Sequence, residues 1–279
     1  VRLRHDSMYM YCDSVILYEG HNSFEAFDNV RMEQGDTLFI YGDYLFYVGM
    51  SQLAMLRNNV KMINRNTTLT TDSLNYDRLF NFGYYFEGGM LTDEQNVLTS
   101  DWGEYSPSTK IAVFNHEVVL DNPQFILYSD TLKYSTESKI ANILGPSNII
   151  SDQNHIYSER GVYDTANGFG ELMDRSILTN QGKKLTGDSL FYDRNTGYGE
   201  AFDNVVMNDT VNKTMLTGNY CYYNELTDYA LATDRAVAID YSSGDSLYMH
   251  ADTLKMITYY PKTDSVFREM RAYHKVRMY

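Results

Sequence analysis

The sequence predicts an all-β fold that is built from repeats of about 29 residues. Three observations support this prediction. A short strand motif recurs at constant spacing, aromatic residues are abundant while proline is rare (26 Tyr, 13 Phe and 4 Pro), and no segment combines helical periodicity with helix caps. Aromatic side chains favour strands because they pack well on a pleated surface. Self-similarity at a fixed period is typical of a stacked repeat architecture.

The recurring motif is an acidic residue followed at the second position by Leu or Gly and at the fourth by Tyr. It runs from Asp43–Tyr47 to Asp188–Tyr192 in steps of 29 residues. A degenerate copy lies at Asn219–Tyr223, and divergent copies begin at Asp13 and Asp252, which gives about nine units. We interpret each unit as a pair of antiparallel strands.

A second strand follows each motif, with its best copies at Phe24–Met32 and Gly199–Met207. Turn-forming clusters such as Asp193–Gly197 separate the two strands, as expected of a hairpin. Polar residues interrupt the second strand between its apolar halves, and we expect a corner there that folds the sheet into two facing limbs. These polar residues are Asp28, Asn58, His116 and Asp203.

Period-2 alternation assigns the acidic residue, the Leu and the Tyr of each motif to one face, because they stand two residues apart. The apolar residues of both strands then form stripes that line the space between the limbs. In a stacked β fold such stripes are more often a packed core than a ligand site. The stripe residues are Leu17, Val30, Leu45, Tyr47, Val60, Leu74, Tyr76, Phe86, Phe114, Val118, Leu132, Tyr134, Leu190, Tyr192 and Val205.

The sequence offers no catalytic motif, no metal ligands and no cofactor motif, so we expect a protein that is not an enzyme. The six histidines are scattered over different repeats, without the spacing of a metal site. The acidic residue recurs in nearly every unit, which suits a structural role better than a paired-carboxylate site. The net charge of −14 argues against nucleic acid and anionic membrane surfaces as partners.

No window of the chain approaches the roughly 20 apolar residues of a transmembrane helix. A signal peptide is also absent, and the chain opens in mid-pattern at Val1–Arg4. We therefore expect residues 1–279 to be a single elongated repeat domain, excised from a longer chain whose targeting segment was removed.

Residues 185–207, together with 24–32 and 39–47, resemble the repeat of the OstA/LptA family of lipopolysaccharide-transport proteins. The Tyr- and Asn-rich style, and Asp28 and Asp203 in place of the usual Gly before Asn-Val, resemble the longer OstA-like proteins of the Bacteroidetes type. The resemblance implies an antiparallel β-jellyroll, a V-shaped β-solenoid or β-taco, in the periplasm or in an assembly at the outer membrane. It also implies head-to-tail partners, which are other jellyroll-domain transport proteins that pair through edge strands.

Two functions follow from these observations. The first is a non-catalytic conduit in which the stripe residues bind the acyl chains of lipopolysaccharide or a related glycolipid. The acidic net charge would keep phosphorylated headgroups outside the seam. The alternative is a structural or adhesive surface β-solenoid whose interior is filled by its own side chains. The volume of the interior separates the two.

Overall fold

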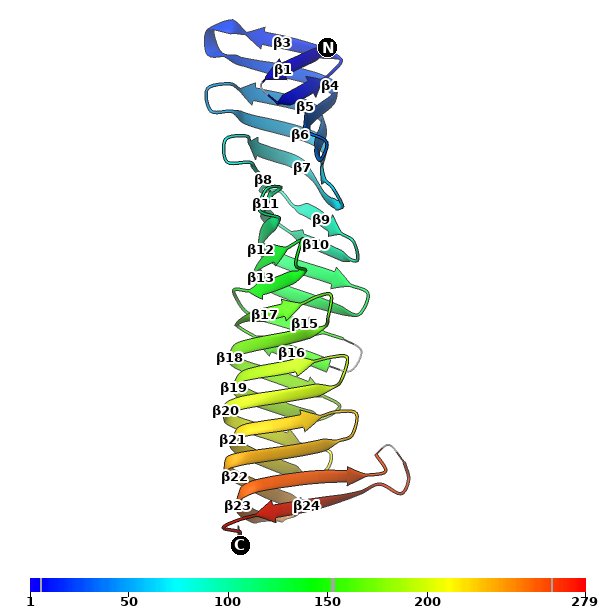
Figure 1. The fold of residues 1–279 in the computed structure, drawn as a ribbon, viewed down its shortest axis with the longest axis vertical. Coiled ribbons are helices and arrows are strands. Elements are labelled where there is room, and N and C mark those ends of the chain that lie inside the picture. The colour runs from blue at the N-terminus through cyan, green and yellow to red at the C-terminus, as the bar shows by residue number, and fades with distance from the viewer. Residues whose placement is uncertain (6, 152–153, 262) are drawn as a thin grey trace. The chain divides into compact units, whose positions relative to one another are not determined.

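A computed structural model describes residues 1–5, 7–151, 154–261 and 263–279. It contains two compact units, Val1–Lys139 and Ile140–Tyr279, and each is described by itself. Both are built from antiparallel strands, and Figure 1 shows the long strands of each unit lying side by side. Within the described residues the helical content is one 3₁₀ turn, η1 (Glu19–His21). The predicted all-β antiparallel class is confirmed, while the single domain over residues 1–279 stays a prediction.

Unit 1 pairs its strands mostly in chain order, each with the one before and the one after it. The strands are β1 (Arg2–His5), β2 (Met8–Tyr11), β3 (Ser14–Tyr18), β4 (Ser23–Gln34), β5 (Leu38–Val48), β6 (Leu53–Asn64), β7 (Thr67–Asp77), β8 (Phe82–Tyr85), β9 (Gly89–Asp93), β10 (Asn96–Ser100), β11 (Trp102–Ser106), β12 (Ile111–Asn122) and β13 (Phe125–Ser135).

Unit 2 repeats the arrangement. Its strands are β14 (Ile140–Ile143), β15 (Ser147–Ile150), β16 (Asn154–Ser158), β17 (Arg160–Asp164), β18 (Phe169–Asn180), β19 (Lys183–Asp193), β20 (Tyr198–Asp209), β21 (Thr214–Asn224), β22 (Tyr229–Ser243), β23 (Asp245–Tyr259), β24 (Phe267–Tyr273) and β25 (Arg277–Met278). Several short strands are the two halves of one bent strand. For example, β8 and β9 both pair with β7, and β10 and β11 both pair with β12.

The long strands bend at the predicted corner. In β4 the residues Asp28 and Asn29 both have positive φ (56° and 51°), and the pairing with β5 shifts between Phe27 and Val30. Such left-handed backbone is uncommon outside glycine, and Asn and Asp adopt it most readily. The corner predicted at Asp28, Asn58, His116 and Asp203 is thus confirmed, and each is followed by a second residue of positive φ. The same pairs occur at Asp174–Arg175 and Asp234–Arg235.

In three of the motifs the acidic residue holds the corner of the next strand from outside. Asn59 Nδ2 donates to Asp43 Oδ2 (2.6 Å), Asn29 to Asp13 (2.8 Å) and Asn204 to Asp188 (2.8 Å). The prediction that this acid shares a face with the Leu and the Tyr is therefore wrong. Asp43 is exposed while Leu45 and Tyr47 are buried, because the corner shifts the pairing between Tyr41 and Tyr44 and breaks the alternation there.

The corner yields a stability test at Asn59. Replacing Asn59 by Ala should destabilise unit 1 by about 1–2 kcal/mol, because a Cβ without local hydrogen bonding disfavours left-handed backbone. Asn59→Gly, which removes the same hydrogen bond but relieves the backbone, should cost clearly less. Urea unfolding of both variants measures the difference. Equal losses in the two would mean that the bond to Asp43, rather than the backbone conformation, maintains the corner.

Candidate functional site

The space between the two limbs is the candidate site, and most predicted stripe residues lie in it. Each of the following exposes 6% of its surface or less: Val30, Leu45, Tyr47, Val60, Leu74, Tyr76, Phe114, Val118, Leu132 and Tyr134 in unit 1, and Leu190, Tyr192 and Val205 in unit 2. Water does not reach these side chains, so within each unit the inner faces of the limbs pack against each other.

Two predicted stripe residues are not buried. Phe86, which exposes 55% of its surface, follows the end of β8, and its neighbour Tyr85 (1%) occupies the interior instead. Gly89 and Gly103 make room for Tyr85, since a Cβ on either would lie within 2.6 Å of that side chain. The prediction for Phe86 is wrong, because the break between β8 and β9 interrupts the alternation. Leu17 (59% exposed) does line the interior, but at an end of unit 1 where a cavity replaces packing.

Polar side chains close the edge of unit 1 that lies opposite the corner, where the free ends of the limbs meet; we call this edge the mouth. Tyrosine hydroxyls from one limb donate across it to residues at the end of the other. Tyr76 bonds Gln34 (3.3 Å), Tyr105 bonds Asn64 (3.2 Å) and Tyr134 bonds Asp93 (2.8 Å).

Lysines reinforce the mouth of unit 1 from the turns. Lys139 Nζ contacts both oxygens of Asp93 at 2.8 Å and Glu94 at 3.4 Å, and Lys110 donates to Asn64. The Asp93 side chain is 1% exposed, so this pair is shielded from water. The partners of the tyrosines were missed by sequence reasoning. Their signal was present, because Gln34, Asn64, Asp93 and Asn122 end successive limbs at intervals of 29 or 30 residues.

The mouth of unit 2 is closed in the same way. Asn154 Nδ2 donates to the Tyr192 hydroxyl (2.5 Å), and Lys183 donates to the Tyr223 hydroxyl (3.2 Å). Asp228 binds Lys183 and accepts from Thr258 Oγ1 (3.0 Å) and Arg268 Nη2 (3.2 Å). Burial alone would raise the pKa of Asp228, but the hydrogen bond and charge of Lys183 outweigh it and lower that pKa below its usual value of 3.8.

The interior tyrosines stay neutral. Burial raises the pKa of Tyr85 to about 12, and burial also raises the pKa values of Tyr76, Tyr192 and Tyr223. Each keeps its hydroxyl proton at physiological pH and can donate it across the interior or the mouth. The mouth therefore consists mainly of neutral hydrogen bonds, with ion pairs added at Asp93 and Asp228.

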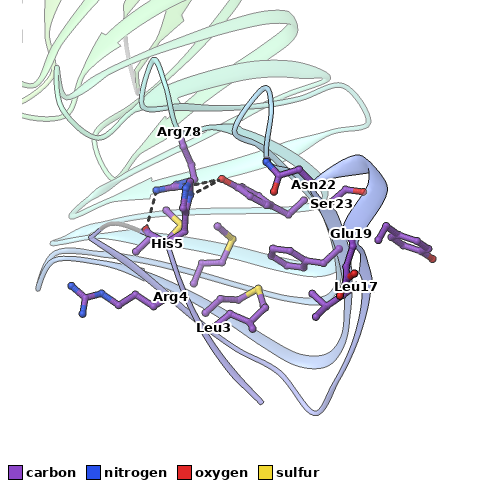
Figure 2. A pocket seen from close by; sticks show the side chains of 15 residues that line it. Leu3, Arg4, His5, Leu17, Glu19, Asn22, Ser23 and Arg78 are labelled. Atoms are coloured by element: carbon purple, nitrogen blue, oxygen red, sulfur yellow. Dashed lines mark hydrogen bonds between the residues drawn. The ribbon is translucent and has the colours of Figure 1, made fainter.

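One cavity opens into the interior of unit 1, beside β1 to β4. Its volume is about 450 Å³, and Figure 2 shows the side chains around it. Its lining is apolar at Leu3, Met8, Met10, Leu17, Phe24 and Met32. Arg4, His5, Tyr47, Arg78 and Glu19 add polar groups. A smaller cavity of about 220 Å³ lies at the mouth of unit 2, lined largely by polar residues such as Lys183, Asp228 and Arg268.

Among the residues that the structure describes, no three His, Cys, Asp or Glu side chains gather in a way that could hold a metal ion. Cys12 and Cys221 are both buried and free. In the same described part of the chain, no helix has the length and apolar character needed to cross a membrane.

Part of the chain matches a known protein family. Residues 1–130, which cover unit 1 up to β13, match the model of the family described as OstA-like protein. These residues, just under half of the chain, are similar to the OstA-like family. The match contains β1 to β12, the cavity and most of the mouth network of unit 1. The resemblance predicted from the repeat motif is confirmed.

Two solved structures are similar in part. One is LptH from Pseudomonas aeruginosa, described as the LptA-homologous periplasmic component of the lipopolysaccharide transport device. It is 16% identical, with a TM-score of 0.33, over 37% of this chain and 80% of that one. The other is the WD40 domain of SCAP from fission yeast, at 10% identity and a TM-score of 0.14, over 97% of this chain and 86% of that one. No curated protein matches the chain.

Asp228 yields a pH test of the mouth of unit 2. Because its folded pKa is lowered, its stabilising effect is present above pH 3.8 and is lost as the pH falls through the folded pKa. Asp228→Asn should destabilise unit 2 by about 1–3 kcal/mol at pH 7, since it removes the nearer carboxylate partner of Lys183. That deficit should shrink towards pH 3.

Thermal unfolding at pH 7 and pH 3 measures the deficit. Asp245→Asn, an exposed carboxylate of the same unit, serves as the matched control and should change little at either pH. A deficit of the same size at both pH values would contradict the lowered pKa of Asp228.

Proposed function

We propose that the protein is a non-catalytic component of lipopolysaccharide transport that works in the periplasm and shields acyl chains between its two limbs. The OstA-like match of residues 1–130 and the apolar interior of each unit support this proposal. An acyl chain needs a continuous apolar surface rather than a single reactive site. Removing each CH₂ from water contributes about 0.8 kcal/mol, so such a surface binds long chains well without polar contacts.

The cavity beside β1 to β4 is the observation that carries this proposal. Its 450 Å³ falls within the range of about 300–1,000 Å³ that is typical of small-molecule sites. Leu3, Met8, Met10, Phe24 and Met32 give it an apolar wall, and methionine adapts readily to ligands of irregular shape. We assign it as the place where an acyl chain first leaves water.

Beyond the cavity, the limbs must separate before an acyl chain can advance. The stripe residues from Leu45 to Tyr134, apart from Phe86, are packed in this conformation, so lipid contact with them requires the mouth to open. At the corner the continuous backbone joins the two limbs. At the mouth the limbs are held together by side-chain hydrogen bonds, such as Tyr134–Asp93, and by ion pairs. We therefore propose that the limbs part at the mouth and that the stripe residues then line the groove.

Edge strands would supply the contacts to partner proteins. Among the described strands β1 pairs with β2 alone, which leaves its other edge for a strand of another jellyroll-domain transport protein. The net charge of −14 disfavours nucleic acid as a partner.

The packed interior also favours a second function. A β-solenoid whose inner side chains expose 6% or less already has a filled core, and a structural or adhesive surface protein needs nothing more. The two functions differ in what the cavity binds. A conduit binds lipid in the cavity at Leu17, whereas a scaffold does not.

Leu17 and Phe86 form a matched pair for the test. Both are apolar and similarly exposed (59% and 55%), but Leu17 lines the cavity, whereas Phe86 lies outside the interior. A photo-crosslinking amino acid at position 17 should capture lipopolysaccharide, while the same group at position 86 should capture little. Denaturing gels probed for lipopolysaccharide give the readout. Equal capture at both positions, or none at position 17, would support the scaffold function.

A further inference from the structure

The positively charged side chain of Arg78 lies at the polar side of the cavity in unit 1. Arg78 lies in the turn after β7 and lines the cavity (Figure 2). Its guanidinium contacts residues at the ends of β1 and β5. Its Nη1 donates to the Tyr47 hydroxyl (2.6 Å) and to His5 Nδ1 (2.5 Å), and its Nη2 donates to the His5 carbonyl (3.3 Å). Because a guanidinium only donates, His5 Nδ1 acts as the acceptor.

The partners of Arg78 do not neutralise its charge. They are a hydroxyl, a ring nitrogen and a backbone carbonyl, and no carboxylate of the described residues forms an ion pair with it. Its Nε is buried and has no hydrogen-bond partner. Lys139 and Lys183 at the two mouths, by contrast, contact carboxylates in this chain of net charge −14. The Arg78 guanidinium therefore keeps a buried N–H donor, on Nε, for which the described residues supply no acceptor.

The rest of the cavity suits an alkyl chain. Met8 and Met10 expose 5% of their surface and Met32 exposes 2%, and Phe24 stacks on Tyr47 with ring centroids 5.1 Å apart. Arg4 also lines the cavity, and Glu19 is the carboxylate in its lining. The site thus combines an apolar pocket with a guanidinium that forms no ion pair with a carboxylate of the described residues.

We propose that this cavity binds an alkyl chain that ends in an anionic group, a carboxylate or a phosphate, with Arg78 holding that group. The guanidinium fork matches both oxyanions, and charge-assisted hydrogen bonds are stronger than neutral ones. The inference rests on the proposed function in that the apolar wall takes an acyl chain. It goes further because it assigns an anionic group to the inside of the cavity, whereas the acidic net charge alone predicts that such groups stay outside.

The test measures how four probes displace a fluorescent apolar dye from the whole protein, with the two anionic alkyl probes below their micelle concentrations and 1-dodecanol below its solubility limit. Dodecyl phosphate and dodecanoate should bind at least about tenfold more tightly than 1-dodecanol, the matched uncharged chain, since hydrogen bonds to charged groups exceed neutral ones by that order. Inorganic phosphate should not compete at the concentrations at which dodecyl phosphate binds.

Arg78→Gln should abolish the preference for the anionic probes and leave the affinity for 1-dodecanol unchanged. Arg31→Gln is the matched control, because Arg31 is exposed, pairs with Glu33 and does not line the cavity. Leu17→Trp should weaken all three alkyl probes alike by filling the cavity from an exposed position. Circular dichroism melting curves show whether each variant folds.

Three results would overturn the inference. They are equal affinity for charged and uncharged chains, an anionic preference that survives Arg78→Gln, and competition by inorganic phosphate as strong as that by dodecyl phosphate. If 1-dodecanol binds and the preference is absent, this inference fails while the proposed function stands. If no alkyl probe binds, the apolar wall takes no chain and both fail.

Discussion

The rest of the structure depends on the corner at which each long strand turns on two consecutive left-handed residues. Extended strands with period-2 alternation would form a flat sheet with one apolar face exposed to water. A corner at the same position in each strand folds that sheet on itself, so that the apolar halves of one strand face each other. Asn and Asp at Asp28–Asn29 and Asp203–Asn204 make this conformation accessible, and the acidic residue of the preceding strand fastens it.

This constraint makes the two edges of the interior unequal. At the corner the chain itself joins the limbs, whereas at the mouth they meet through side chains such as Tyr105 and Asn64. A neutral hydrogen bond of this kind contributes about 0.5–1.5 kcal/mol. Separating the limbs at the mouth, one hydrogen bond at a time, therefore costs less free energy than unfolding the backbone at the corner. The proposed conduit uses this difference: its interior is packed without lipid and admits an acyl chain when the mouth opens.

Much of the fold followed from the sequence because its determinants are local and repeated. Alternation and the polar interruptions predicted the strands, the corner and thirteen of the interior positions, which are buried in both units. Asp43 and Phe86 were misplaced for one physical reason: strict alternation fails where a corner or a strand break inserts a residue. The mouth partners and Arg78 were missed because they meet across the limbs, and pairs such as Lys139 and Asp93 lie 46 residues apart.

We propose that the mouth is closed without lipid and opens to take it. Glu94 and Glu137 are both exposed. They lie in turns on opposite sides of this mouth, because Lys139, at the end of the turn that holds Glu137, contacts Glu94 at 3.4 Å. Spin labels at positions 94 and 137, measured by double electron–electron resonance, report the separation of the two limb ends directly. We expect a short, narrow distance distribution in lipid-free protein that lengthens when lipopolysaccharide is bound. An unchanged distance in protein shown to carry lipid would contradict it.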